Sequence, residues 1–423
     1  MSSEAENIVQ PKGGKPLGRK ELVFVTAMLM ALHALAIDGM LPALDEIAGE
    51  LGALQSNDRQ LIIGLFLMAS GAGTLAPGLL ADRFGRKRLL MIALGCYVVF
   101  GFACAFVQTF NQMLVLRVLQ GFFSAGLMVL PGAIIRDQFE GDRMARVFSL
   151  ISAVFITVPV IAPSIGQMVL YVAGWRWIFV GLGFMGIAMM IWAWIRIPET
   201  LHPEYRQEIK PRVLARNMYI AVSSRAAIGY VLGTALVIGT VFGYVNSAQQ
   251  LIGEHFLAGE MFPYVFGASA ATMAVASIVN SRIVERFGAR RVSHIGLIAF
   301  IAISALQVWV AHSSHSNSLA FFFPLIAMNM ALLGFLGANF GSIAMQPFAE
   351  IAGAAASIQA FIRMFGASLI GIAIGQAYDD TARPLAWALL IAAIMALLLI
   401  LFSERGKLFR RLHVTPPPRS HDL

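Results

Sequence analysis

The stretch Gly78-Leu-Leu-Ala-Asp-Arg-Phe-Gly-Arg-Lys-Arg88 lies between two long apolar runs, one ending at Leu80 and the next beginning at Leu89. Its acidic residue, Asp82, and its basic cluster could not remain in hydrocarbon, where a charged side chain costs about 2.5–3.5 kcal/mol on insertion scales. Gly85 can supply a sharp turn, because glycine adopts backbone conformations that other residues avoid. The stretch therefore predicts a tight loop at a membrane surface between two spanning helices.

The composition agrees with a membrane protein. The chain has 423 residues, of which 58% are hydrophobic and only 13% charged, whereas a soluble protein averages about 25% charged residues. The net charge of +8 could indicate a nucleic-acid-binding protein. The basic residues lie in short loops between apolar runs, however, so we expect the lipid bilayer as a partner and no nucleic acid.

Twelve apolar runs divide the chain into spans and loops. Each approaches the roughly 20 residues that a helix needs to cross the hydrocarbon layer. A polar stretch from Arg196 to Arg225 separates them into two sets of six. We therefore expect an N-terminal cytoplasmic tail over 1–20, a six-helix bundle over 21–196, a cytoplasmic linker over 197–225, a second six-helix bundle over 226–404 and a C-terminal tail over 405–423. The runs cover 22–42, 59–80, 89–107, 112–134, 146–170, 176–195, 226–250, 261–281, 292–311, 319–342, 351–377 and 384–402.

The distribution of Lys and Arg predicts the orientation of the chain. The basic residues fall almost entirely in the two tails and the even-numbered loops, and the odd-numbered loops carry only Arg59, Arg176 and Arg383. Loops rich in Lys and Arg remain in the cytoplasm. Both termini are therefore expected to be cytoplasmic.

The opening stretch recurs half a chain later. Ser281-Arg-Ile-Val-Glu-Arg-Phe-Gly-Ala-Arg-Arg291 matches Gly78–Arg88, with Glu285 in place of Asp82. Each copy follows the second run of its set of six. The sequence therefore predicts two pseudo-symmetric halves related by an axis along the membrane normal.

The pattern G-x-L-A-D-R-x-G-R-[KR] resembles the signature loop between the second and third helices of the major facilitator superfamily. The resemblance implies an all-α integral membrane protein with the major facilitator fold, 12 transmembrane helices in two pseudo-symmetric six-helix bundles. It also implies a conformational latch, in which Asp82 meets the start of the eleventh helix in the outward-facing state. The residues expected in this latch are Gly78, Asp82, Arg83, Gly85, Arg86, Arg136 and Asp137. For Arg136 and Asp137 a solvated loop pair is the alternative.

Three charged side chains lie clearly within spans: Asp38, Arg117 and Arg363. Asp38 and Arg117 are at similar depth below the predicted external surface, so we expect them to be close enough to influence each other. A carboxyl group in apolar surroundings tends to be neutral and a nearby guanidinium favours its ionised form, so relative movement of the two could load and release a proton. The alternative is a static ion pair that fixes helix packing. His33 could join a proton relay or could be a hydrogen-bonded packing residue.

Two further patterns resemble proton-coupled drug exporters. Asp38 with Pro42 resembles the first-helix motif of these proteins, and Arg117-x-x-Gln120-Gly121 resembles their fourth-helix motif, in which the arginine serves proton transfer. Both patterns imply that the chain exchanges a substrate for protons.

The fifth run resembles the antiporter motif G-x-x-x-G-P-x-x-G-G through Pro159, Pro163 and Gly166. It departs from the motif at Val158, Ala162 and Gln167. Two-proline forms of this kind are similar to bicyclomycin and chloramphenicol exporters of the Bcr/CflA type, which implies multidrug efflux and antibiotic resistance. Kinks and close helix packing are the alternative use of these residues.

Polar residues within the spans are candidates for substrate contacts, although each could equally form an interhelical hydrogen bond. Arg363 could anchor a substrate or cap backbone carbonyls at a kink. One intramembrane carboxyl against two arginines favours a neutral or zwitterionic amphiphilic small molecule. The candidate substrate-binding residues are Asp38, Arg117, Tyr244, Asn246, Asn339, Gln359 and Arg363.

The combined reading is proton-coupled efflux (drug:H⁺ antiport) of small amphiphilic compounds across a bacterial inner membrane by alternating access. The alternative is a proton symporter or facilitator that imports a small metabolite. An enzyme is not expected, because the histidines form no metal-ligand set: His312 and His315 share a loop without acidic partners and the others are scattered. We expect a monomer with no metal and no cofactor, with protons as the coupling ion.

Overall fold

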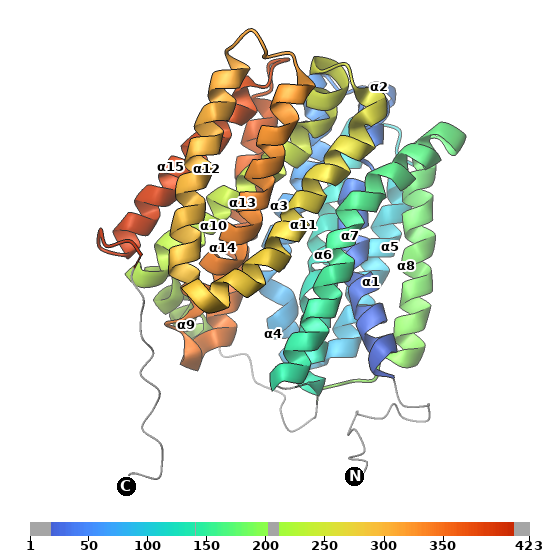
Figure 1. The fold of residues 1–423 in the computed structure, drawn as a ribbon. Coiled ribbons are helices and arrows are strands. Elements are labelled where there is room, and N and C mark those ends of the chain that lie inside the picture. Colours follow the sequence, from blue (N-terminus) through green and yellow to red (C-terminus); the bar gives the residue numbers. More distant parts are fainter. Residues whose placement is uncertain (1–17, 140, 202–210, 410–423) are drawn as a thin grey trace, which may run out of the picture.

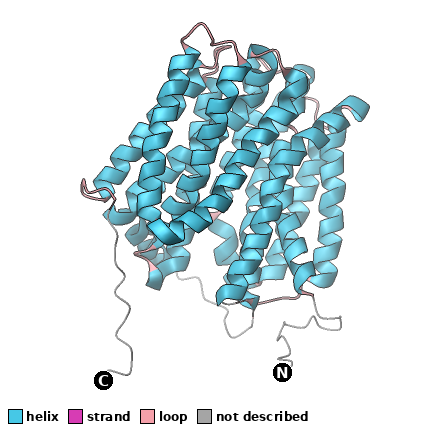
Figure 2. Ribbon diagram, viewed as in Figure 1, coloured by secondary structure: helices cyan, strands magenta, loops and turns pink. Residues whose placement is uncertain are grey.

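The computed structural model describes residues 18–139, 141–201 and 211–409, and its regular elements are all helical (Figure 2). Two groups of long helices stand side by side (Figure 1). The first group is α1 (Arg19–Asp38), α2 (Leu44–Leu51), α3 (Leu61–Gly73), α4 (Leu75–Phe84), α5 (Arg86–Cys104), α6 (Phe110–Gln138), α7 (Gly141–Ala173) and α8 (Arg176–Arg196). The second is α10 (Arg225–Gln250), α11 (Phe262–Phe287), α12 (Ala289–Ala311), α13 (Leu319–Met345), α14 (Ala352–Gln376) and α15 (Arg383–Ser403).

The described helices cover the twelve predicted apolar runs. Ten helical segments are individually long and apolar enough to cross a membrane, and α3 with α4 forms an eleventh that is bent by 42°. The remaining predicted run, 146–170, lies within α7, a 33-residue helix. The predicted runs match these helices with shifts of a few residues at their ends. In the chain between α8 and α10, residues of the predicted polar linker form a further helix, α9 (Pro211–Ser223).

Two runs that were predicted as single spans are interrupted. The first run stops as α-helix at Asp38 and continues through Gly39 into the short 3₁₀ helix Leu41–Ala43, which carries Pro42. The second bends at Thr74, whose hydroxyl donates to the carbonyl of Gly71 at 2.7 Å. Pro77 follows three residues later and has no N–H to continue the helical ladder. Both interruptions therefore have a local chemical cause.

The groups meet along two pairs of helices, α3 with α14 and α7 with α11. Glycines allow the close approach. A Cβ on Gly71 of α3 would collide with the backbone of Phe365 in α14, and one on Gly267 of α11 would press on Val160 of α7. α7 is thus packed between α1 of its own bundle and α11 of the other.

The repeat is visible in the backbone. Gly85 has φ 101° and ψ 147°, and Gly288 has φ 84° and ψ 145°. Each glycine joins two helices without an intervening residue, in a conformation that residues with a Cβ rarely adopt. The predicted sharp turn is confirmed at both copies.

α1 begins and α15 ends on one side of the molecule, which we call the terminal side (Figure 1). The opposite side, which carries α2 and the 3₁₀ helix Ser56–Gln60, is called the distal side. Gly85 and Gly288 lie on the terminal side.

Candidate functional site

Arg117 joins three helices inside the first bundle. It is completely buried in α6, and its guanidinium donates to the carbonyls of Ala36 in α1 at 2.9 Å and Ile62 in α3 at 3.2 Å. A third bond, of 2.6 Å, goes to Oε1 of Gln120 in its own helix. The guanidinium also lies 4.0 Å from the ring centroid of Phe66. Each of its three nitrogens therefore has a protein acceptor.

Asp38 is the last residue of α1 and is only 6% exposed. In the part of the chain that the structure describes, its carboxyl group forms no hydrogen bond and no ion pair. Arg117 contacts α1 two residues earlier, at the carbonyl of Ala36, so the static ion pair with Asp38 is not formed in this conformation. The carboxyl group is left buried and unpartnered at the negative end of a helix dipole.

The antiporter-like segment of α7 packs directly against this helix end. A Cβ on Gly166 would collide with the backbone carbonyl of Gly39, the residue after Asp38. Pro163 and Pro159 lie about one and two turns earlier in α7, which stays helical through both. Gly166 thus sets the separation between α7 and the end of α1.

His33 is buried one and a half turns before Asp38. Its Nδ1 lies 3.0 Å from the hydroxyl of Ser124 in α6. Ser124 donates its only proton to the carbonyl of Gly121 at 2.6 Å, so Nδ1 of His33 acts as the donor. The histidine ring packs on Phe66, with centroids 5.3 Å apart. Among the described residues no hydrogen bond joins His33 to Asp38, so this conformation contains no continuous relay between them.

Two candidate residues of the second bundle, Tyr244 and Asn339, already have protein partners. The hydroxyl of Tyr244 in α10 lies 3.2 Å from that of Ser269 in α11. Asn339 in α13 exchanges two amide hydrogen bonds with Asn280 in α11, of 3.0 and 3.3 Å. In this conformation these two candidates join helices, which is the alternative that the sequence left open.

Gln359 similarly donates from α14 to the carbonyl of Ala344 in α13 at 3.1 Å. Two other candidates, Asn246 and Arg363, leave most of their hydrogen-bonding atoms without a partner in the described chain. Neither amide atom of the buried Asn246 has a hydrogen-bond partner within the described chain. Arg363 donates only from Nε, at 3.3 Å, to the carbonyl of Gln359.

Polar contacts that the sequence did not reveal join the bundles on the distal side. Arg59 is nearly buried and bridges Asp45 of its own bundle and Glu254 of the other, at 2.5 Å each. The side-chain amide of Gln60 donates to that of Gln250. The only sequence signal was that Arg59 is one of few basic residues on the predicted external side.

Asn57 adds a second part to this set of contacts, which we call the distal clasp. Its amide donates to the carbonyls of Gln376 and Tyr378 at 3.2 and 2.8 Å, and Gln376 returns a bond of 2.8 Å to the carbonyl of Asn57. The distal clasp thus comprises the ion pair of Arg59 with Glu254 and the amide contacts of Asn57, Gln60, Gln250 and Gln376 between the two bundles.

On the terminal side the predicted latch residues bond within their own half. Arg86 pairs with Asp82 at 2.5 Å and with Asp137 at 3.1 Å. Asp137 also accepts from Thr200 at 2.7 Å. Glu199 caps the start of α5 by accepting from the backbone N–H of Arg86 at 2.8 Å. These contacts join α4, α5, α6 and the segment after α8.

The other latch candidates contribute little in this conformation. Arg83 is exposed, with its guanidinium 5.3 Å from the ring of Phe84, and Arg136 is exposed without a described partner. A Cβ on Gly78 would meet no atom within 4 Å, so no other helix packs closely on Gly78 in this conformation. Asp82 forms no described bond to the start of α14.

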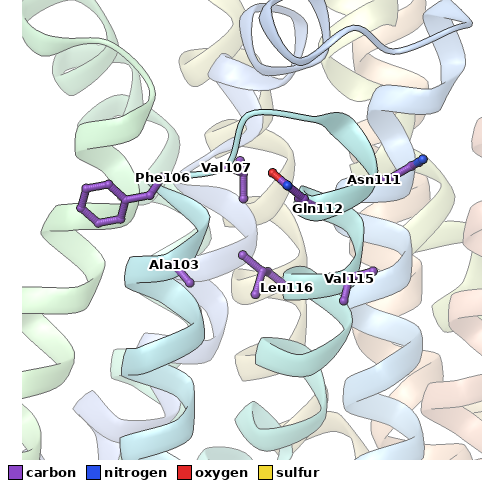
Figure 3. Close-up of a pocket in the computed structure, with 7 residues that line it drawn as sticks. All are labelled: Ala103, Phe106, Val107, Asn111, Gln112, Val115 and Leu116. Atoms are coloured by element: carbon purple, nitrogen blue, oxygen red, sulfur yellow. The ribbon is translucent and has the colours of Figure 1, made fainter.

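A hollow of about 470 Å³ lies elsewhere, between the end of α5 and the start of α6 (Figure 3). Phe106 and Val115 in its lining are 76% and 59% exposed, so it opens on the outer surface of the first bundle. None of the candidate residues lines it. The complete lining is Ala103, Phe106, Val107, Asn111, Gln112, Val115 and Leu116.

Comparisons with known proteins agree with the geometry. A family model described as Major Facilitator Superfamily matches residues 26–371. A bicyclomycin resistance protein homolog of Haemophilus influenzae is 26% identical over 90% of this chain and 95% of its own length. The multidrug resistance protein MdtL of Escherichia coli is also 26% identical, over 90% of this chain and 94% of its own length.

Two solved structures show the same fold. A bacterial homolog of the human lysosomal transporter Spinster, in an inward-facing and unoccupied conformation, aligns with a TM-score of 0.70 and 15% identity over 93% of this chain and 98% of that one. The human organic anion transporter MFSD10 aligns with a TM-score of 0.61 and 17% identity over 92% of this chain and 100% of that one.

Proposed function

The chain belongs to the Major Facilitator Superfamily and is a multi-pass inner-membrane protein, and from this premise we propose that it exports small amphiphilic compounds in exchange for protons. Relatives named for bicyclomycin and multidrug resistance, matched over most of both chains, support export. They do not favour import of a metabolite.

The observation that carries the proton coupling is the state of Asp38. A carboxyl group that is 6% exposed and has no described partner is costly to keep ionised. It can therefore bind a proton in one conformation and release it in another, when a cation or water approaches. Arg117 holds α1 at Ala36, two residues before Asp38, and Gly166 packs on Gly39, the residue after it, so a small movement of α1 against α7 changes the surroundings of Asp38.

The basic loops support an orientation with both termini in the cytoplasm, which makes the distal side external. The distal clasp would then hold the external side closed in the described conformation. Transport would proceed by rocking of residues 21–196 against 226–404, which breaks the clasp and brings Asp82 towards the start of α14. We propose a monomer that needs no cofactor and takes a neutral or zwitterionic amphiphile.

Proton flux in reconstituted vesicles tests the proposal. An inward proton gradient is imposed and a panel of neutral, zwitterionic and cationic drugs is added, with a pH-sensitive dye as the readout. We expect at least one compound to dissipate the gradient with the wild type and with Glu260→Gln, an exposed carboxyl outside the site. With Asp38→Asn the same compound should dissipate no gradient.

Two results would contradict this assignment. Coupled proton flux in Asp38→Asn equal to that of the wild type would remove Asp38 as the coupling site. Movement of a drug by the wild type without any proton flux would remove antiport altogether.

A further inference from the structure

Arg363 is a guanidinium in the middle of a span with most of its hydrogen-bonding capacity unused. It lies near the centre of α14, Ala352–Gln376. Its Nε donates to the carbonyl of Gln359 one turn earlier in the same helix, at 3.3 Å. Within the described ranges, Nη1 and Nη2 have no acceptor and the side chain forms no ion pair. The two nitrogens of the fork are therefore free.

The fork lies between α14 and α13. Its Nη1 is 3.2 Å from the position that a Cβ of Gly341 would occupy, so this glycine leaves room for the guanidinium. One turn away, a Cβ at Gly337 would meet no atom within 4 Å. Gln359 reaches across the same gap to the carbonyl of Ala344. Arg363 is half-buried, so its fork is not fully enclosed by the protein.

An unpaired guanidinium at this depth is expensive, and such groups usually mark a substrate or ion pathway. Its planar pair of N–H donors matches the two oxygens of a carboxylate. Arg117 cannot serve in the same way, because each of its nitrogens already donates to the protein. Of the two arginines within spans, only Arg363 offers a free fork.

Building on the proposed export function, we propose that Arg363 binds a carboxylate of the transported compound, so that within the proposed substrate class zwitterionic amphiphiles, which carry a carboxylate, are preferred to neutral ones. Arg363 is then the residue that distinguishes these substrates from neutral ones. The carboxylate would lie against Gly337 and Gly341, and the apolar part of the compound would remain free to adapt to the rest of the path.

The test uses 1-naphthoate and 1-naphthamide, which share one ring system and differ in the carboxylate. Binding to the purified full-length protein is measured by calorimetry for the wild type, Arg363→Gln, Arg363→Lys and the control Arg405→Gln, an exposed arginine after the last span. We expect the wild type and the control to bind 1-naphthoate about tenfold more tightly than 1-naphthamide, since a charge-assisted pair is lost in the amide. Arg363→Gln should lose this preference while keeping its affinity for 1-naphthamide. Arg363→Lys should keep only part of the preference.

Unchanged binding of 1-naphthamide also establishes that Arg363→Gln is folded. If Arg363→Gln cannot be purified, the proposal is tested by the preference for 1-naphthoate over 1-naphthamide in the wild type and in Arg363→Lys. Equal affinity of the wild type for both probes, no binding of 1-naphthoate, or a full preference retained in either variant would overturn the proposal.

Vesicle transport of the same probes separates this inference from the export function. Proton-coupled movement of both probes at equal rates by the wild type and Arg363→Gln would leave export standing and remove the role of Arg363. Preferential binding of 1-naphthoate without any coupled proton movement would support the role of Arg363 and contradict proton-coupled export.

Discussion

The two bundles treat their intramembrane arginines in opposite ways. Arg117 in the first bundle is completely buried and fully bonded to the carbonyls of Ala36 and Ile62 and to Gln120. Arg363 in the second is half-buried and has one bond, to its own helix. The same side chain therefore serves as a structural junction in one bundle and as an open group in the other. A charged residue within a span indicates a structural or a functional role. The number of its hydrogen-bond donors that remain unused distinguishes the two roles.

The largest expected effect is a difference in the free energy of unfolding between Arg117→Gln and Arg363→Gln. Arg117→Gln removes the bonds that join α6 to the carbonyls of α1 and α3. We expect it to lower the free energy of unfolding by about 2–4 kcal/mol, since three buried bonds are lost and each contributes roughly 0.6–1.7 kcal/mol in membrane proteins. Arg363→Gln should change it by less than about 1 kcal/mol. Unfolding in mixed micelles measures both.

Equal losses in the two variants would break the comparison, because they would show that Arg363 is as structural as Arg117. Arg405→Gln provides the baseline for a basic residue outside the spans.

A second test concerns the other contact that positions α1. Gly166→Ala places a methyl group where the carbonyl of Gly39 lies, so α7 must move away from the end of α1 next to Asp38. We expect a loss of about 1–3 kcal/mol in stability, as for other overpacked sites, together with most of the coupled proton flux. Gly181→Ala, where a Cβ meets nothing within 4 Å, should behave like the wild type. Normal coupling in Gly166→Ala would show that the fixed position of α1 is not needed.

The smallest expected effect concerns the distal clasp, which holds the two unlike bundles together. Glu254→Gln removes the acceptor that Arg59 uses in the second bundle but leaves its pair with Asp45. A partly exposed ion pair contributes up to about 1 kcal/mol, so the population of molecules with a separated distal side should rise by up to about fivefold.

Spin labels at Leu54 and Leu257, which are 96% and 87% exposed on the two bundles, report this separation as a distance distribution in a background without Cys96 and Cys104. Glu260→Gln controls for the loss of an acidic group nearby. An unchanged distribution in Glu254→Gln would show that the amide contacts alone hold the clasp.

The sequence predicted the fold because apolar run length and the repeated glycine loop are local signals. It did not locate the break after Asp38 or the bend at Thr74, although Gly39, Pro42 and Pro77 supply both. Glycine and proline are tolerated in spans, so their presence alone does not establish an interruption.

The site was harder to predict, because depth along a helix does not give the direction of a side chain. Asp38 and Arg117 were expected to influence each other at equal depth, but Arg117 bonds to the carbonyl of Ala36 instead. The pairing of Asn339 with Asn280 depends on two helices that are distant in sequence. The same holds for the distal clasp, whose members come from three separate segments.

The distal clasp combines one ion pair with several amide contacts, and this mixture has a consequence for an organism in a changing medium. The bonds of Asn57, Gln60, Gln250 and Gln376 carry no net charge, and amides do not titrate in the physiological range. Salt screens charged groups but hardly affects such bonds. On the proposed orientation, the surface that meets acid, brine or fresh water is sealed mainly by groups that are insensitive to all three.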